Sequence, residues 1–215
     1  MNDEIIIEVN EVSKKYDDAT VLDNVSLEIE KGKIYGLVGR NGSGKTVLMK
    51  CICGLIKPTS GEVKVAGKTV GKDVDIPEDI GVIIETPGFI PNYSGFKNLK
   101  LLASVRNKIS NEEIRKNMEI VGLEPKSRKH VGKYSLGMRQ KLGIAQAIME
   151  KPKILILDEP MNGLDNESVA VVRKILKEQA ENGATIILAS HNREDIDVLC
   201  DKVYTMDHGV IECER

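Results

Sequence analysis

The sequence predicts an α/β fold: a P-loop type core with a mostly parallel sheet, an antiparallel β subdomain, and an inserted α-helical subdomain. The first observation is a set of short, nearly continuous apolar runs bounded by turn residues, typical of strands buried on both faces. The second is that helical patterns separate these runs, as in βαβ units. The third is period-2 alternation near both ends of the chain, which is typical of antiparallel strands.

The N-terminal segments are expected to form the antiparallel sheet. They read IIIEVNEVSKKY, TVLDNVSLEIEKG and GEVKVAGKTV, with turn signals between them. The C-terminal segment DKVYTMDHGVIEC has a similar alternation, so we expect antiparallel pairing there as well.

The core strands are expected at the apolar runs 33–39, 80–85, 153–158 and 184–190. Helical patterns cover 44–54, 111–121, 137–150 and 167–181. Residues 87–150 are mostly helical, with loops at Pro87, Gly88, Pro91 and Gly95. We therefore expect one domain over 1–215, with a helical subdomain at approximately 87–150.

Composition excludes several classes of protein. The 215 residues include 31 basic and 33 acidic side chains, a net charge of -2, which argues against a dedicated nucleic-acid binder. No apolar run approaches the ~18 residues that span a membrane, and MNDEIIIEVN lacks a signal peptide's basic start. We expect a cytoplasmic protein without direct membrane insertion. The four cysteines are expected to be reduced and to pack without binding metal.

A phosphate-binding loop is indicated by GRNGSGKT, from Gly39 to Thr46, which follows an apolar strand and opens a helix. Glycines let successive backbone N–H groups face phosphate oxygens, and the helix N-terminus adds partial positive charge. Lys45 is expected to reach the β- and γ-phosphates, and the Thr46 hydroxyl to bind Mg²⁺.

Three polar residues follow two other buried strands. Asp158 ends ILILD, where a carboxylate can hold the Mg²⁺ shell, and Glu159 comes next, where it can act as a general base toward water. His191 follows ILAS at the end of another strand, where open α/β sheets place ligands. The imidazole could donate to the γ-phosphate or orient the attacking water.

The motifs GRNGSGKT, YSLGMRQ, ILILDEP, NGLD and SHN, in this order and spacing, resemble those of the ATP-binding subunit of an ABC transporter. The resemblance covers essentially the whole chain. It implies that Glu159 is the catalytic base, that His191 is the switch histidine, and that Asp158 is the Mg²⁺-associated acid. The segment IIETPGFIPNYSG resembles the corresponding segment in exporters of antimicrobial peptides such as bacitracin and lantibiotics.

The resemblance also implies a set of ATP-contacting residues. Tyr16 matches an aromatic that stacks on adenine, with an ordinary residue of the β layer as the alternative. Asp165 matches a loop that communicates across a dimer, or it is simply a helix-capping acid. The phosphate-loop matches are Gly39, Asn41, Gly42, Ser43, Gly44, Lys45 and Thr46, followed by Val47 through its backbone N–H.

YSLGM aligns with the family's signature loop, which implies head-to-tail dimerisation with a second ATP-binding subunit, of the same or another chain. Each nucleotide would then lie between one subunit's phosphate loop and the other's signature helix. Ser135 supplies a hydroxyl, Gly137 an exposed N–H, and the helix its positive end toward the γ-phosphate. ADP lacks that phosphate, so closure is expected to depend on ATP.

Three positions depart from the family pattern. Glu85 stands where a Gln usually reaches Mg²⁺ and the attacking water; a carboxylate can bind Mg²⁺ but adds negative charge beside the triphosphate. Leu136 and Met138 replace a Gly and a Gln of the signature, so contact rests on Ser135 and the backbone near Gly137. Val47 replaces a common hydroxyl residue, which removes one hydrogen bond to the α-phosphate, about 0.5–1.5 kcal/mol.

The expected function is an ATPase that binds MgATP and drives a separate integral membrane permease, at the inner face of the cell membrane. The permease is expected to dock near 85–96, where Phe89, Pro91 and Tyr93 are either exposed contacts or local core. The alternatives are a soluble ABC-type ATPase acting on nucleic acid or ribosomes, and a P-loop kinase. Because 215 residues leave little space beyond one such domain, we expect neither a long coiled-coil insertion nor a second ATPase domain, and we find no acceptor site for a kinase.

Overall fold

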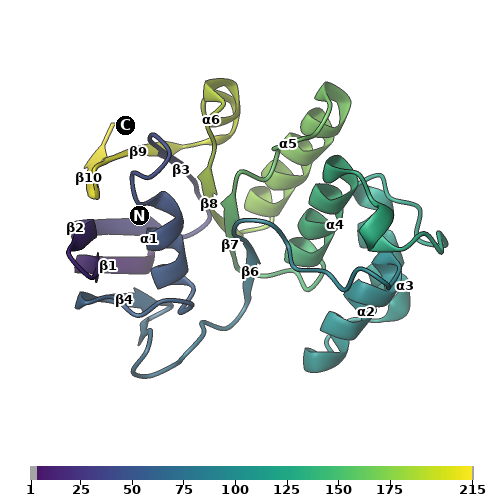
Figure 1. The fold of residues 1–215 in the computed structure, drawn as a ribbon, viewed down its shortest axis with the longest axis horizontal. Helices are drawn as coiled ribbons and strands as arrows, with labels where there is room; N and C mark the ends of the chain where they lie inside the picture. The colour runs from purple at the N-terminus through teal and green to yellow at the C-terminus, as the bar shows by residue number, and fades with distance from the viewer. Residues whose placement is uncertain (1–3, 215) are drawn as a thin grey trace.

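The computed structural model describes residues 4–214, which form two sheets with helix α1 packed between them (Figure 1). The first sheet is antiparallel, in the order β2-β1-β4-β5, which confirms the prediction for the N-terminal segments. Its strands are β1 (Ile5–Tyr16), β2 (Ala19–Glu30), β4 (Ser60–Val65) and β5 (Lys68–Thr69).

The second sheet has the order β10-β9-β3-β8-β7-β6, and all its pairs except β9–β10 are parallel. Its strands are β3 (Ile34–Val38), β6 (Ile80–Ile83), β7 (Ile154–Asp158), β8 (Thr185–Ala189), β9 (Lys202–Asp207) and β10 (Val210–Cys213). The four predicted core strands are therefore confirmed.

The C-terminal hairpin differs from the expectation. Strand β9 pairs in parallel with β3 and so extends the core sheet, and only β10 is antiparallel to it. Both faces of β9 are covered: Val203 packs into the cluster beneath the helices and Met206 into the cluster around α1, whereas β10 is mostly exposed. The alternating polar positions of this segment therefore do not distinguish a parallel from an antiparallel strand.

The near-continuous apolarity of the core strands follows from burial on both faces. In β7, Leu155 and Leu157 pack into the cluster beneath the helices, while Ile154 and Ile156 pack toward α1 (Lys45–Ile52) and the antiparallel sheet. Successive side chains of a strand point to opposite faces, so each strand supplies both layers of core.

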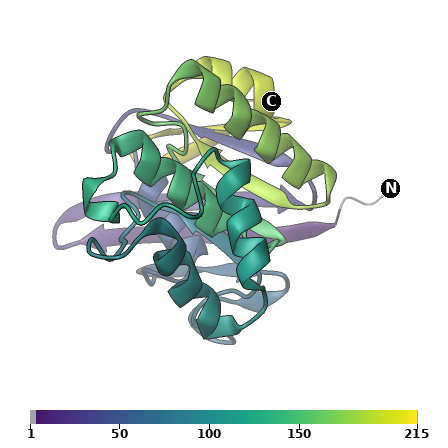
Figure 2. The ribbon, with the colours of Figure 1, turned by 90° about the vertical axis from the view of Figure 1, so that its right-hand side faces the viewer.

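The helices of the second face are α4 (Leu136–Ile148), α5 (Asn166–Glu181) and α6 (Arg193–Leu199). Helices α2 (Gly95–Arg106) and α3 (Asn111–Ile120) lie beside α4 at one end of the molecule, as Figure 2 shows from that end. A short 3₁₀ turn, Val131–Lys133, precedes α4.

Gly95 was expected in a loop but is the buried first residue of α2. A Cβ on it would lie 2.8 Å from the Tyr134 hydroxyl and 3.2 Å from both Leu142 and Met118. The glycine therefore marks a close approach of α2 to the neighbouring helices, and not a turn.

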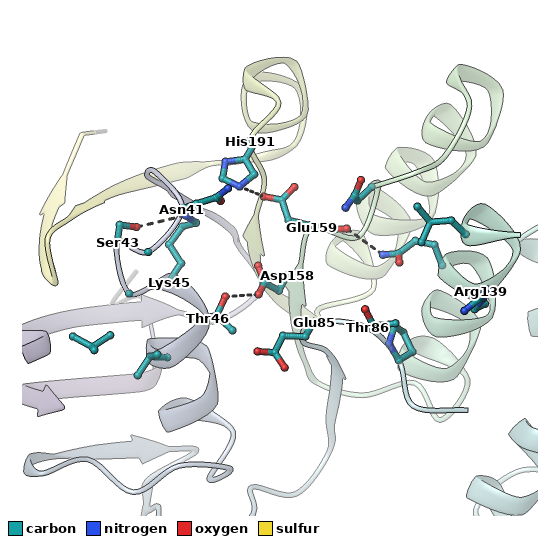
Figure 3. A pocket seen from close by; sticks show the side chains of 18 residues that line it. Asn41, Ser43, Lys45, Thr46, Glu85, Thr86, Arg139, Asp158, Glu159 and His191 are labelled. Carbon is teal, nitrogen blue, oxygen red and sulfur yellow. Dashed lines mark hydrogen bonds and ion pairs between the residues drawn. The ribbon is translucent and has the colours of Figure 1, made fainter. Parts of the chain in front are cut away.

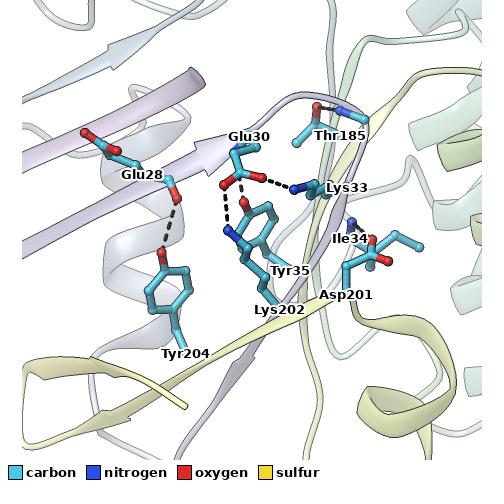
Figure 4. A network of polar contacts seen from close by, with 10 residues as sticks. Glu28, Glu30, Lys33, Ile34, Tyr35, Thr185, Asp201, Lys202 and Tyr204 are labelled. Atoms are coloured by element: carbon cyan, nitrogen blue, oxygen red, sulfur yellow. Dashed lines mark hydrogen bonds and ion pairs between the residues drawn. The ribbon is translucent and has the colours of Figure 1, made fainter. Parts of the chain in front are cut away.

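The two sheets are joined by a polar network at the end of β2 (Figure 4). The Glu30 carboxylate, whose side chain is 15% exposed, accepts from Lys33, just before β3, and from Lys202 of β9 at 2.5 Å. The Tyr35 hydroxyl accepts from the Glu30 N–H at 3.0 Å. The ammonium groups of Lys33 and Lys202 thus bind Glu30, the last residue of β2, to the core sheet.

Two further predictions concern membranes and thiols. Within residues 4–214 no helix combines the length and the apolar character needed to cross a bilayer. Burial raises the pKa of the Cys51 thiol to about 11 and that of Cys53 to about 12, so both stay protonated and unreactive at neutral pH. No cluster of three metal-ligating His, Cys, Asp or Glu side chains exists in the described part of the chain.

Candidate functional site

A cavity of about 360 Å³ opens where β3 and β7 end and α1 begins (Figure 3). Ligands in open α/β sheets bind at this carboxyl edge of the strands. The cavity is lined by most of the predicted phosphate-loop residues and by the predicted residues Glu85, Asp158, Glu159 and His191. Its other lining residues are Val21, Thr86, Pro87, Leu136, Arg139, Gln140 and Asn162. Segments far apart in the sequence therefore meet in one site.

The loop between β3 and α1 can only be built from glycine at two positions. Gly39 has φ 153°, and a Cβ there would lie 2.2 Å from the Met206 carbonyl oxygen; Gly44 has φ 109°, with the Val21 carbonyl oxygen 2.8 Å from such a Cβ. Gly44 is also the N-cap residue of α1, and because glycine has no side chain, no capping side chain accepts a hydrogen bond from the N–H groups at the helix start. These features fit a phosphate group at the helix N-terminus.

Lys45 lies under this loop with its side chain buried. Its ammonium donates to the carbonyl oxygens of Gly39 at 2.7 Å and Arg40 at 2.9 Å. Burial lowers the pKa of Lys45, and the nearby carboxylates Asp158 and Glu159 act in the opposite direction. The cation is therefore held at the loop that would cradle an anion.

Oxygen ligands meet at the floor of the cavity. The Thr46 hydroxyl donates to Asp158 Oδ2 at 2.7 Å, across 112 positions of sequence. One hydroxyl and one carboxylate, supplemented by phosphate oxygens, are the kind of incomplete protein ligand set that Mg²⁺ accepts. Glu85 lines the same cavity, but its carboxylate is paired with Lys50 at 2.7 Å.

Glu159 combines an unusual backbone with a half-buried carboxyl group. Its φ is 50°, a conformation that side-chain-bearing residues rarely adopt, which turns the chain directly after β7. Burial raises its pKa, opposed by the nearby His191. Oε1 is buried and accepts no hydrogen bond, and His191 Nε2 lies 3.3 Å from it without hydrogen-bonding alignment. A buried, unsatisfied carboxylate oxygen fits the position of a water or a hydroxyl donor.

Ser135 and Asp165 lie outside this cavity and cap helices of their own chain. Ser135 Oγ accepts from the Met138 N–H at 3.2 Å at the start of α4, and Asp165 Oδ1 from Ser168 N–H at 2.8 Å at the start of α5. The hydrogen bonds from Ser168 lower the pKa of Asp165. The start of α4 lies close to the turn that precedes α5, because a Cβ on Gly137 would lie 3.0 Å from the Gly163 carbonyl oxygen.

Tyr16 also lies outside the cavity. It ends β1, its side chain is exposed, and the Lys14 ammonium lies 4.9 Å from its ring centroid. The following strand, β2, supplies Val21 to the cavity wall, so the β1–β2 hairpin adjoins the site even though its aromatic residue does not line it.

The three residues expected near the permease-docking segment were either exposed contacts or part of the local core, and the structure contains both kinds. Phe89 is partly buried and packs against the core, whereas Pro91 is exposed. Tyr93 is half-buried, with the Lys97 ammonium 3.7 Å from its ring centroid.

Gln140 was assigned no role from the sequence. Its buried amide Nε2 donates to the carbonyl oxygens of Glu159 at 3.1 Å and Pro160 at 3.0 Å. The only sequence signal is a polar residue on the otherwise apolar face of a helix, and that signal names no partner. Asn162 also went unrecognised; its N–H donates to the Glu159 carbonyl oxygen at 3.1 Å.

Comparison with known proteins agrees with this geometry. Residues 22–162 match the family model described as ABC transporter. The chain is 48% identical over 207 residues, 96% of this chain and 95% of the relative, to the uncharacterized ABC transporter ATP-binding protein YybJ of Bacillus subtilis (strain 168).

Two further relatives have named transport substrates. The chain is 43% identical to the bacitracin transport ATP-binding protein BcrA of Enterococcus faecalis, over 96% of this chain and 68% of the relative. It is 36% identical to the lantibiotic transport ATP-binding protein SrtF of Streptococcus pyogenes, over 98% of this chain and 90% of the relative.

A solved structure, the dimeric post-hydrolysis state of the ATP-binding cassette MJ0796 bound to ADP and Pi, shares the fold. Its TM-score is 0.87 at 22% identity, covering 98% of this chain and 99% of that one. The predicted fold class is thereby confirmed. The family match, the relatives and the phosphate-binding cavity lead to one conclusion: the chain belongs to the ABC transporter family and is an ATP-binding cassette ATPase.

Proposed function

We propose that this chain binds MgATP, dimerises around two nucleotides with a second ATP-binding subunit, and powers a separate integral membrane permease. The observation that carries the proposal is the cavity, which gathers a phosphate loop, the Thr46–Asp158 oxygen pair and the Glu159 carboxylate beside His191. The chain would then be cytoplasmic and held at the inner face of the cell membrane through its permease.

The phosphate loop would bind the triphosphate through the N–H groups of residues 41–47 and the Lys45 ammonium. Thr46 and Asp158 would hold Mg²⁺, with Glu85 as a further oxygen ligand within the same cavity. Mg²⁺ supplies charge neutralisation on the β- and γ-phosphate oxygens. Tyr16, exposed on the adjoining hairpin, would cover the adenine.

Glu159 would take a proton from the attacking water at its carboxylate, and His191 would orient that water or the γ-phosphate. A raised pKa supports this role, because a carboxylate with higher proton affinity is a stronger base near neutral pH. The 3.3 Å separation of His191 Nε2 from Glu159 Oε1 brings both groups to one position.

The second nucleotide contact would come from the partner subunit. Ser135, the Gly137 amide and Asp165 lie at two helix starts outside the chain's own cavity, which supports their use by another molecule. The helix end would favour the negative γ-phosphate, so the closed dimer would form with ATP and open with ADP.

Export of peptide antibiotics is the transport activity we propose, on the basis of the bacitracin and lantibiotic transport relatives. The permease would dock near 85–96. A groove of about 260 Å³ lies beside this segment; Leu55, Ile76, Ile84 and Pro87 are among the residues that line it. Apolar lining of this kind is suited to a protein contact.

Glu159→Gln tests the ATPase and the dimer together. It removes the base without removing the phosphate loop, so we expect ATP binding to persist, hydrolysis to fall by about 10²-fold or more, and an ATP-dependent dimer to accumulate. Phosphate release and size-exclusion chromatography with ATP measure these effects.

Adding Ser135→Arg to Glu159→Gln serves as the matched variant. It should abolish the dimer while the monomer still binds ATP, because the arginine blocks only the contact made in trans. Full hydrolysis by Glu159→Gln would remove Glu159 as the base, and loss of monomer ATP binding on adding Ser135→Arg would contradict the trans site.

A further inference from the structure

The cavity carries an excess of acidic groups for a site that binds a triphosphate. Glu85, Asp158 and Glu159 line it, against Lys45 and Arg139. The Arg139 guanidinium already donates to the Tyr134 carbonyl oxygen from Nε at 3.3 Å and Nη2 at 3.2 Å. Each carboxylate disfavours a polyanion nearby, and the Mg²⁺ proposed above would offset only part of this charge, so a counter-charge beside Glu85 would favour triphosphate binding.

Lys50 supplies that charge from the helix that begins at the phosphate loop. It follows Thr46 by one turn of α1, and its ammonium lies 2.7 Å from Glu85 Oε1. The Lys50 side chain is 23% exposed and that of Glu85 is 65% exposed. Lys50 does not line the cavity, so the pair places the carboxylate at the rim and the cation behind it.

The backbone of Glu85 is unusual as well. Its φ is 58°, in the left-handed region that residues with side chains rarely adopt. In Figure 3 the Glu85 carboxylate lies below Thr46 and turns to the side of α1. The hydrogen-bonded ion pair therefore fixes both where this carboxylate lies and how much of its charge the cavity experiences.

We propose that Lys50 is a positioning residue that neutralises the Glu85 carboxylate and holds it at the cavity rim, which allows a third carboxylate beside the triphosphate. The inference rests on the proposed binding of MgATP. Because partly exposed ion pairs contribute little to folding, removal of Lys50 should change nucleotide affinity more than stability.

A double-mutant cycle on the full chain tests this role, with the Kd for MgATP measured by titration of a fluorescent ATP analogue. Lys50→Met should weaken binding about two- to fivefold, the range for one partly exposed charge pair, and Lys50→Arg should retain wild-type affinity. In a Glu85→Gln background, Lys50→Met should cause no further loss, because no carboxylate is left to neutralise. Higher salt should shrink the loss.

Lys100→Met, which removes an exposed lysine of α2 outside the cavity, is the matched control and should bind like the wild type. Equal losses from Lys50→Met in both backgrounds, or no loss in the wild type, would overturn the proposal. A large fall in Tm for Lys50→Met alone would also overturn it, by making Lys50 structural. A wild-type chain that binds no ATP would instead overturn the proposed function.

Discussion

Gln140, the last residue of the YSLGMRQ motif, shows how one side chain without an expected role can hold the site together. Its amide ties α4 to the turn after β7 through two carbonyl oxygens, those of Glu159 and Pro160. That turn contains Glu159 at φ 50°, a strained conformation that surrounding contacts must maintain. Gln140 therefore acts on the Glu159 carboxyl group through the backbone.

Gln140→Leu should lower kcat about tenfold with little change in KM for ATP. The substitution removes two buried hydrogen bonds, and a loss of about 1–3 kcal/mol is enough for that change in rate. ATPase kinetics measure the split between kcat and KM. Gln146→Leu, on the same helix with no side-chain hydrogen bond to this turn, is the control. A rise in KM with unchanged kcat would show that Gln140 does not position Glu159.

At the scale of elements, β6 packs closely against the C-terminal end of α4, the helix whose first residue, Leu136, lines the cavity. A Cβ on Gly81 of β6 would lie 2.1 Å from the Ala147 carbonyl oxygen of α4 and 2.8 Å from Leu155 Cδ2. Interiors at this packing density cannot accommodate another methyl group without moving a helix or strand.

Gly81→Ala should lower the free energy of unfolding by about 1–3 kcal/mol, as overpacking does in cores. Urea unfolding followed by circular dichroism measures it. Gly88→Ala is the matched control, because nothing lies within 4 Å of its Cβ position. Equal stability of the two variants would mean that α4 can shift away from β6 at no cost.

For the whole molecule, the joint between the two sheets depends on the charge of Glu30. Its hydrogen bond with Lys202, followed by that with Lys33, lowers its pKa (Figure 4). Stability from a lowered pKa is present above the ordinary glutamate value, 4.5, and is lost as pH falls through the lowered value.

Glu30→Gln should therefore lower Tm by a few degrees at neutral pH, because Lys33 and Lys202 lose their counter-charge. The difference from the wild type should shrink as pH falls below the ordinary glutamate pKa. Thermal unfolding between neutral and acid pH measures it, with the exposed Glu112→Gln as control. A Tm difference that does not vary with pH would exclude the charge of Glu30 as its cause.

Much of the fold could be predicted because local patterns carry it. The four apolar runs became β3, β6, β7 and β8, since burial on both faces leaves no polar position in a short strand. Helix α2 was not separately located, and Gly95 was placed in a loop, because a glycine at a close approach looks the same in sequence as one in a turn. The direction of β9 was hidden for a similar reason, since alternating polar positions do not distinguish a parallel from an antiparallel strand.

The sequence alone determined the phosphate loop, the strand that ends in Asp158, the strand that precedes His191, and the order of the family motifs. The loop depends on local backbone conformation and the strands depend on the periodicity of apolar residues, and both are determined by residues that are neighbours in the sequence. Only the tertiary structure decided that Thr46 meets Asp158, that Gln140 supports the Glu159 turn, and that Glu85 pairs with Lys50. Such contacts join residues tens of positions apart, and the packing of the two sheets and α1 brings them within reach of each other.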